Sequence, residues 1–299
     1  MLKKSRSVFV LLFIFGFSAT LMGNEWANYY FPDAVGSYWT YEDQDGEELT
    51  RYAIAPEEIN GETYRAFSYD PVLEDWADYQ YYVHPYFYQV SDDWIAFFIG
   101  EDIENATRAI TEQQWNEVVT LMKQQMNNQM PPGVTIDLDV TYELDVEAQD
   151  YFYFLPTPAT YNEEWEALRV NTKVDLQISI TSNLESFPPT SQAITMFLTL
   201  VETGNVTGTE TVETAAGTFE DCLKIEYTVD ATIETNPEIP EAKSMFADAY
   251  GGSVTTLWLA PNVGIVQMLQ ESKSTDTVKT LELTNYEIKS TESGSTESK

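Results

Sequence analysis

The 299-residue sequence is poor in the residues from which most catalytic and metal sites are built. It has one cysteine, Cys222, so neither an intrachain disulfide nor a cysteine-rich zinc site can form. It has one histidine, His84, so a histidine metal cluster is excluded. A Gly-x-Ser-x-Gly elbow, a glycine-rich phosphate loop and a dinucleotide fingerprint are all missing. We therefore expect no catalytic residue, no metal and no cofactor, and we interpret the protein as non-enzymatic.

The few residues that could carry chemistry also have ordinary structural explanations. His84 lies in an aromatic β stretch, where a local hydrogen bond would satisfy its ring. Cys222 follows two acidic residues, whose charge disfavours the thiolate that catalysis needs. The acidic run 42–48 lacks the periodicity of a calcium loop, and we interpret it as a solvated hairpin tip. Carboxylates are so numerous that a glycosidase-like pair stays open, but no spacing singles one out.

Basic residues are scarce. The chain has 15 Lys and Arg against 49 Asp and Glu, a formal net charge of −34. Such a surface repels phosphate backbones and anionic head groups, so we expect no nucleic-acid partner. Hydrophobic residues make up 43% of the chain, which is too many for a disordered acidic protein and enough for a sizeable core.

Long apolar runs are missing except near the N-terminus. Residues 1–23 have a basic start, an apolar stretch over 8–17 and small residues up to Gly23, as in a secretory signal peptide. We expect cleavage after Gly23 and an exported protein, periplasmic or extracellular, with no transmembrane segment in the mature chain. The tail 290–299 contains only Ser, Thr, Glu, Gly and Lys, so we expect it to be disordered. Residues 24–289 are then interpreted as a single β-rich domain.

The strongest pattern in the sequence is a period of two. Apolar residues alternate with polar or charged ones over 134–146, and the pattern returns over 170–180 and 223–233. Successive side chains of a strand point to opposite faces, so each segment predicts a long strand with one apolar face. Near the C-terminus the alternation changes phase, which predicts a bulge near Thr284 and Asn285. We predict a mainly β fold, a long-stranded and strongly curved antiparallel sheet (an open or half barrel) with one or two helices on its apolar face.

Helical spacing appears in two places. Residues 111–129 carry an apolar stripe, begin with a capping box of Thr111 and Gln114, and are followed by two prolines and a glycine. A shorter helix is predicted over 238–250. If the first helix covers the apolar face of the sheet, its stripe would line a ligand cavity; the candidate residues are Trp115, Val118, Val119, Met122 and Met126.

Aromatic residues are concentrated in the first third of the mature chain, especially over residues 64–98. Aromatic rings beside carboxylates are typical of sugar-binding surfaces. They are also good strand formers at half-buried positions. The alternative candidates for stacking on sugars are Tyr79, Tyr81, Tyr86, Tyr88 and Trp94.

Three stretches carry a family resemblance: Tyr-Phe-Pro-Asp-Ala-Val-Gly-Ser-Tyr-Trp from residue 30, Ala-Ala-Gly-Thr-Phe-Glu-Asp-Cys from residue 215, and Trp-Leu-Ala-Pro-Asn-Val-Gly-Ile-Val from residue 258. Together they resemble a group of uncharacterised bacterial exported proteins that are similar in turn to the Lol-type lipoprotein carriers. The resemblance implies an open, curved antiparallel half barrel with helices over its hollow. It implies no catalytic residue.

Two classes of function follow from these observations, with a third beside them. The first is a non-enzymatic carrier or binding protein that holds an apolar ligand, a lipid or an acyl chain. The second is a carbohydrate- or surface-polymer-binding module that uses the Tyr and Trp residues of 64–98. The third is an envelope-interaction protein without a small ligand.

Overall fold

The structure is a computed structural model that describes residues 26–73, 83–128, 134–183, 188–239, 252–272 and 277–290. The predicted leader 1–23, most of the second predicted helix and the tail beyond residue 290 lie outside these residues. No helix in the described ranges is long and apolar enough to cross a membrane.

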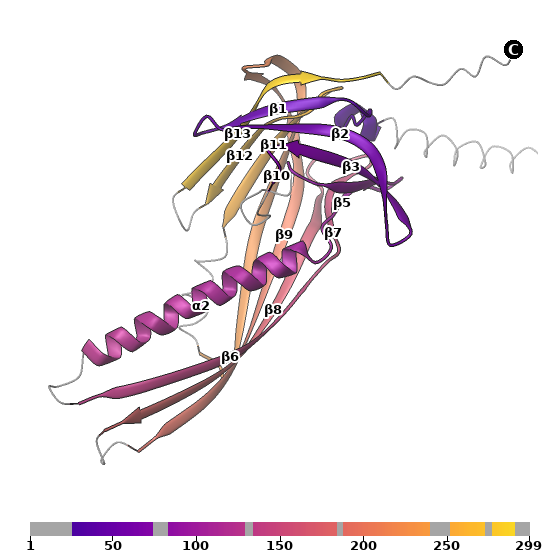
Figure 1. The fold of residues 1–299 in the computed structure, drawn as a ribbon. Coiled ribbons are helices and arrows are strands. Elements are labelled where there is room, and N and C mark those ends of the chain that lie inside the picture. The colour runs from indigo at the N-terminus through magenta and orange to yellow at the C-terminus, as the bar shows by residue number, and fades with distance from the viewer. Residues whose placement is uncertain are drawn as a thin grey trace, which may run out of the picture.

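The described strands form one antiparallel sheet of 13 strands (Figure 1). In chain order they are β1 (Tyr38–Asp43), β2 (Glu48–Ile59), β3 (Glu62–Asp70), β4 (Phe87–Val90), β5 (Trp94–Phe98), β6 (Ile136–Ala148), β7 (Tyr151–Pro156), β8 (Glu164–Ser182), β9 (Thr190–Thr214), β10 (Gly217–Asn236), β11 (Ser253–Ala260), β12 (Gly264–Ser272) and β13 (Thr277–Glu287). One long helix, α2 (Asp102–Asn128), interrupts them, and a short helical segment covers residues 26–30. The prediction of a mainly β fold with long antiparallel strands is therefore confirmed.

The order of the strands shows how the sheet is built. It runs β6-β8-β9-β10-β11-β12-β13-β1-β2-β3-β4-β5-β7, so the first and last strands of the chain are neighbours in its middle. At their junction Thr40 pairs with Asn285 and Tyr41 with Leu283, which leaves Thr284 as an extra residue. The bulge predicted from the change of phase is thus confirmed.

The predicted strong curvature is wrong, because the sheet is neither strongly curled nor closed. The edge strands β6 and β7 do not pair with each other. In place of a hollow, large side chains from strands that are distant in the sheet order pack against one another. Tyr227 of β10 donates a hydrogen bond to the carbonyl oxygen of Phe154 on β7, and its ring lies 5.5 Å from that of Phe152. Large aromatic side chains of this kind pack a main core that leaves no room for a barrel interior.

The long strands extend beyond this main core. β8, β9 and β10 have 19, 25 and 20 residues, and β6 pairs along the outer end of β8. We call this extension of the strands the arm: residues 136–148, 170–182, 190–200 and 231–236. Figure 1 shows α2 running along the arm, away from the rest of the sheet. Because strands of this length cannot all be covered by the main core, the arm needs a second apolar contact to be stable.

Candidate functional site

Helix α2 begins nine residues before the predicted start. Thr111, the predicted cap, lies inside the helix and is buried. The first turn instead carries Asp102 and Glu104, whose negative charge favours the positive end of the helix dipole. The capping box is therefore a wrong prediction, because a local pattern of two side chains competes with tertiary contacts that extend the helix.

Two hydrogen bonds attach the first turns of α2 to the edge strand β6. The backbone N–H of Ala148 donates to Oε1 of Glu104 at 2.9 Å, and Nη1 of Arg108 donates to the carbonyl oxygen of Leu144 at 2.7 Å. Glu104, Arg108 and Thr111 occupy the same helix face as Trp115, at spacings of three or four residues. These bonds therefore orient the predicted stripe toward the sheet.

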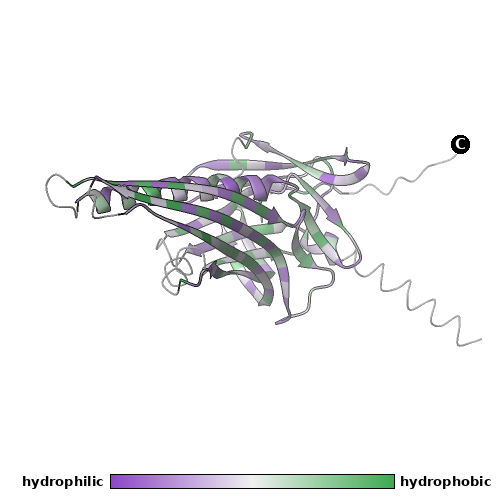
Figure 2. Cartoon of the chain, turned by 90° about the horizontal axis from the view of Figure 1, so that it is seen from below, coloured by the Kyte–Doolittle hydropathy of each residue, from purple (hydrophilic) through white to green (hydrophobic). Residues whose placement is uncertain are grey.

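A second apolar cluster lies in the arm, separate from the main core. Five side chains of β8, β9 and β10 are fully buried in it: Val174, Leu176, Met196, Leu198 and Ile233. Seven further residues pack around them and are only half-buried: Trp115, Val140, Tyr142, Leu144, Ile194, Leu200 and Ala231. Strand alternation supplies the sheet side of this cluster, as the sequence predicts, and the hydropathy bands along the arm strands show it (Figure 2).

Trp115 of the predicted α2 stripe packs against this cluster, and the stripe as a whole is incompletely covered. Trp115, Val118, Val119 and Met126 are half-buried, and Met122 is 37% exposed. In the main core the corresponding apolar side chains are almost all inaccessible. Apolar surface therefore stays accessible on α2 and also on the part of the sheet beside it. In an interface with a purely structural role, this apolar surface would be packed.

The opposite face of the arm is strongly acidic. The side chains of β6 that point away from the cluster are exposed, and most are carboxylates: Asp137, Asp139, Glu143, Asp145 and Glu147. Lys173 of β8 contacts Asp175 at 2.6 Å on this face. The apolar side chains of β6 occupy the other face of the strand.

The predicted sugar-stacking residues do not form one platform. Tyr79 and Tyr81 lie outside the described residues. Tyr88 faces the core, is 1% exposed and donates a hydrogen bond to Asp33 at 2.8 Å. Tyr86 is half-buried, and its hydroxyl donates to the carbonyl oxygen of Leu73 at 3.3 Å. Trp94 is half-buried and packs against the main core.

Trp94 belongs to a row of aromatic rings that the sequence analysis missed. The row continues through Tyr153, Tyr151 and Phe98 to Tyr64, with successive centroids 5.3, 6.5, 5.6 and 4.9 Å apart. The hydroxyls of Tyr64 and Tyr151 lie 2.7 Å apart, and Tyr64 also donates to Glu62 at 3.0 Å. Burial and these hydrogen bonds raise the pKa of Tyr64. The Tyr-x-Tyr spacing in 151–153 was the available signal, but only the pairing of β5 with β7 brings the rings together.

The single cysteine and histidine both lie in the interior. Cys222 is fully buried, and its Sγ lies 3.4 Å from the carbonyl oxygen of Phe219. Burial raises the pKa of the Cys222 thiol to about 11, and the neighbouring Asp221 adds to this. Burial and the charge of Arg51 lower the pKa of His84 to about 3. The thiol is therefore protonated and the imidazole neutral near pH 7. Within the described ranges, no group of three His, Cys, Asp or Glu residues is arranged to hold a metal ion.

The buried histidine makes a testable contribution to acid stability. Its pKa is lower in the folded protein than its ordinary value of 6.5, so the unfolded chain binds the proton more strongly. The stability that His84 provides is present above pH 6.5 and is lost as the pH falls toward about 3. Compared with His84→Gln, the unmodified protein should lose about 1.4 kcal/mol of unfolding free energy per pH unit below pH 6.5, measured by urea denaturation. Parallel pH curves for the two proteins would contradict this.

Comparison with known proteins gives one family match. Residues 190–283 match the family described as DUF3108-like. This region contains two of the three stretches that carry the resemblance noted from the sequence, those beginning at residues 215 and 258. No curated protein matches the chain.

Two solved structures are similar to the chain at low identity. One is a candidate exported protein with a YmcC-like fold from Bacteroides fragilis, at 13% identity and a TM-score of 0.36, covering 87% of this chain and 99% of that one. The other is a candidate lipoprotein from Parabacteroides distasonis, at 12% identity and a TM-score of 0.32, covering 87% of this chain and 98% of that one. TM-scores of this size do not establish a common fold.

Proposed function

We propose that the protein is an exported, non-enzymatic carrier that holds an apolar ligand, a lipid or an acyl chain, between α2 and the apolar face of the arm. One observation carries the proposal: apolar side chains remain half-exposed on both sides of the same interface. The leader-like sequence 1–23 supports export, and the resemblance to Lol-type carriers supports the ligand class.

The energetics of the arm favour such a ligand. Each buried CH₂ group of an acyl chain contributes about 0.8 kcal/mol, so a chain lying along the stripe gains several kcal/mol without any polar contact. Met122 and Met126 are flexible side chains that adapt to irregular apolar shapes. Glu104 and Arg108 attach the first turns of α2 to β6. The rest of the helix can then move as a lid over the ligand.

The test compares neighbouring positions on α2. Met122 is on the stripe, whereas Leu121 points away from the sheet and is 55% exposed. We expect the unmodified mature protein to bind dodecanoate, seen by native mass spectrometry and by a change in tryptophan fluorescence. Met122→Glu should weaken this binding by about tenfold or more, because a charge would be buried against the chain. Leu121→Glu is the matched control and should bind as the unmodified protein does.

Two results would contradict the proposal: no bound acyl ligand in any preparation, or equal losses in Met122→Glu and Leu121→Glu. If oligosaccharides instead change the tryptophan fluorescence, and Trp94→Ala abolishes the change, the second candidate function is favoured. The row of rings from Trp94 to Tyr64 is the observation that supports it, since sugars stack on aromatic faces. Binding of neither an acyl ligand nor an oligosaccharide would favour an envelope-interaction protein.

A further inference from the structure

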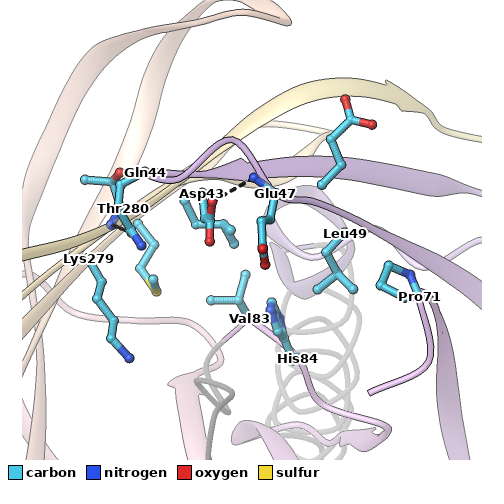
Figure 3. Close-up of a pocket in the computed structure, with 12 residues that line it drawn as sticks. Asp43, Gln44, Glu47, Leu49, Pro71, Val83, His84, Lys279 and Thr280 are labelled. Atoms are coloured by element: carbon cyan, nitrogen blue, oxygen red, sulfur yellow. Dashed lines mark hydrogen bonds between the residues drawn. The ribbon is translucent and has the colours of Figure 1, made fainter. Parts of the chain in front are cut away.

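A small cavity lies outside the arm, in the part of the sheet where the two ends of the chain meet. It has a volume of about 200 Å³ and is formed by the β1–β2 hairpin, β12, β13 and the segment that begins at residue 83 (Figure 3). Its base is apolar and buried, with side chains from Leu49, Val83, Met268 and Leu281. His84, which is 7% exposed, lies beside them. The cavity therefore combines a buried apolar base with polar and charged side chains that could orient a small molecule.

At the rim of this cavity the carboxylate of Asp43 is held in place by hydrogen bonds, whereas the side chain of Glu47 is exposed. Oδ1 of Asp43 accepts hydrogen bonds from the backbone N–H groups of Asp45 and Glu47, each at 2.9 Å. Oε1 of Gln44 accepts from the backbone N–H of Thr280 at 3.0 Å, which ties the hairpin tip to β13. Figure 3 shows the carboxylates of Asp43 and Glu47 directed toward Val83 and His84. The acidic run is the exposed tip of the β1–β2 hairpin, as expected from the sequence, and its side chains also line one side of the cavity.

Lys279 of β13 brings a positive charge to the same cavity. In the described part of the chain it forms no ion pair with any carboxylate. His84 adds no charge near pH 7, because burial lowers its pKa to about 3. The cavity thus presents the carboxylates of Asp43, Glu47 and Glu48 and the ammonium group of Lys279 around an apolar base.

We propose that this cavity binds a small zwitterion, an amino acid with an apolar side chain. Its ammonium group faces Asp43 and Glu47, its carboxylate faces Lys279, and its side chain occupies the well above Val83 and Leu281. The volume fits a ligand of this size: an engineered apolar cavity of about 150 Å³ binds benzene, whereas drug-sized ligands need about 300 Å³ or more. An amine alone would leave Lys279 without a partner, and a carboxylic acid alone would meet the acidic rim.

The test uses leucine and three relatives that each lack one feature. With the full mature protein, calorimetry should detect leucine binding. Binding should be weaker by about tenfold or more for 3-methylbutan-1-amine, which lacks the carboxylate, and for 4-methylpentanoate, which lacks the ammonium group. Leucinamide, which resembles the N-terminus of a peptide, should also bind weakly. Leucinamide or the amine binding as well as leucine would overturn the zwitterion and assign the cavity to a cation or a peptide end.

Substitutions of residues that line the cavity test whether leucine binds there. Lys279→Met should reduce leucine affinity about tenfold and remove the preference for leucine over leucinamide. Glu47→Gln should reduce it without affecting the thermal unfolding temperature, because the Glu47 side chain is exposed. Lys123→Met, on an exposed position of α2, is the matched control and should leave binding unchanged. Equal affinities in Lys279→Met and Lys123→Met, or no leucine binding at all, would overturn the proposal. Met122→Glu should not affect leucine binding, so this proposal and the acyl carrier fail independently.

Discussion

An Arg51→Ala variant is expected to lose about 2–5 kcal/mol of unfolding free energy, in the range of large-to-small changes in a packed core. Arg51 is 1% exposed. Its guanidinium carbon lies 4.5 Å from the ring centroids of both Trp39 and Phe67, and its Nη1 donates to the carbonyl oxygen of Val83 at 3.3 Å. A desolvated cation over an aromatic face contributes about 2 kcal/mol or more. Alanine would remove these contacts and leave a cavity between the rings.

Arg51→Met is the control, because methionine keeps the apolar stem and removes the charge. Replacing a buried charge by an apolar group of similar length is often close to neutral, so Arg51→Met should be at least about 1 kcal/mol more stable than Arg51→Ala. It should also raise the pKa of His84, since the charge of Arg51 helps to lower it. Both effects are measurable, by chemical denaturation and by NMR titration of the single histidine. Equal losses in the two variants would mean that the charge, and not the packing, stabilises this core.

A Gly204→Ala variant is expected to be destabilised by about 1–3 kcal/mol or more, because the added methyl group has no space. A Cβ atom at position 204 would lie 2.3 Å from Cζ2 and 2.4 Å from Cε2 of Trp165. The indole covers the backbone of β9 at this glycine, and its Nε1 donates to the carbonyl oxygen of Tyr153 at 2.8 Å. Trp165 therefore joins β8 to the edge strand β7 only if residue 204 has no side chain.

The control is the same substitution in a Trp165→Leu background. There the clash is absent, so Gly204→Ala should cost at least about 1 kcal/mol less than in the unmodified protein. Gly208, also on β9, has no atom within 4 Å of an added Cβ, and Gly208→Ala should be nearly neutral. If Gly204→Ala and Gly208→Ala have the same stability in thermal and urea denaturation, the close contact with Trp165 is not energetically important.

The candidate sites were predictable to different degrees. The stripe of α2 and the alternating strands beneath it were predictable from the sequence. Both follow local periods, which are 3.6 residues for a helix and two for a strand. The aromatic row was not predictable, since it depends on the pairing of β5 with β7, and α2 and β6 lie between these two strands in the chain. The zwitterion cavity was not predictable either. Asp43, His84 and Lys279 are distant in sequence, and each has an ordinary local interpretation.

Local alternation by itself determined much of this protein: a mainly β fold, long strands with one dry face, the bulge at Thr284 and the apolar face of α2. These features depend only on which side of a strand or helix each residue occupies. Tertiary structure alone decided that β13 pairs with β1, that β6 and β7 are at opposite edges, and that aromatic side chains fill the expected hollow. The physical reason is that pairing between distant strands depends on the packing of whole faces, and many arrangements share the same local pattern. Volume filling by side chains such as Tyr227 and Phe154 selects among these arrangements, and it is also what leaves the arm under α2 and the cavity beside His84 incompletely filled.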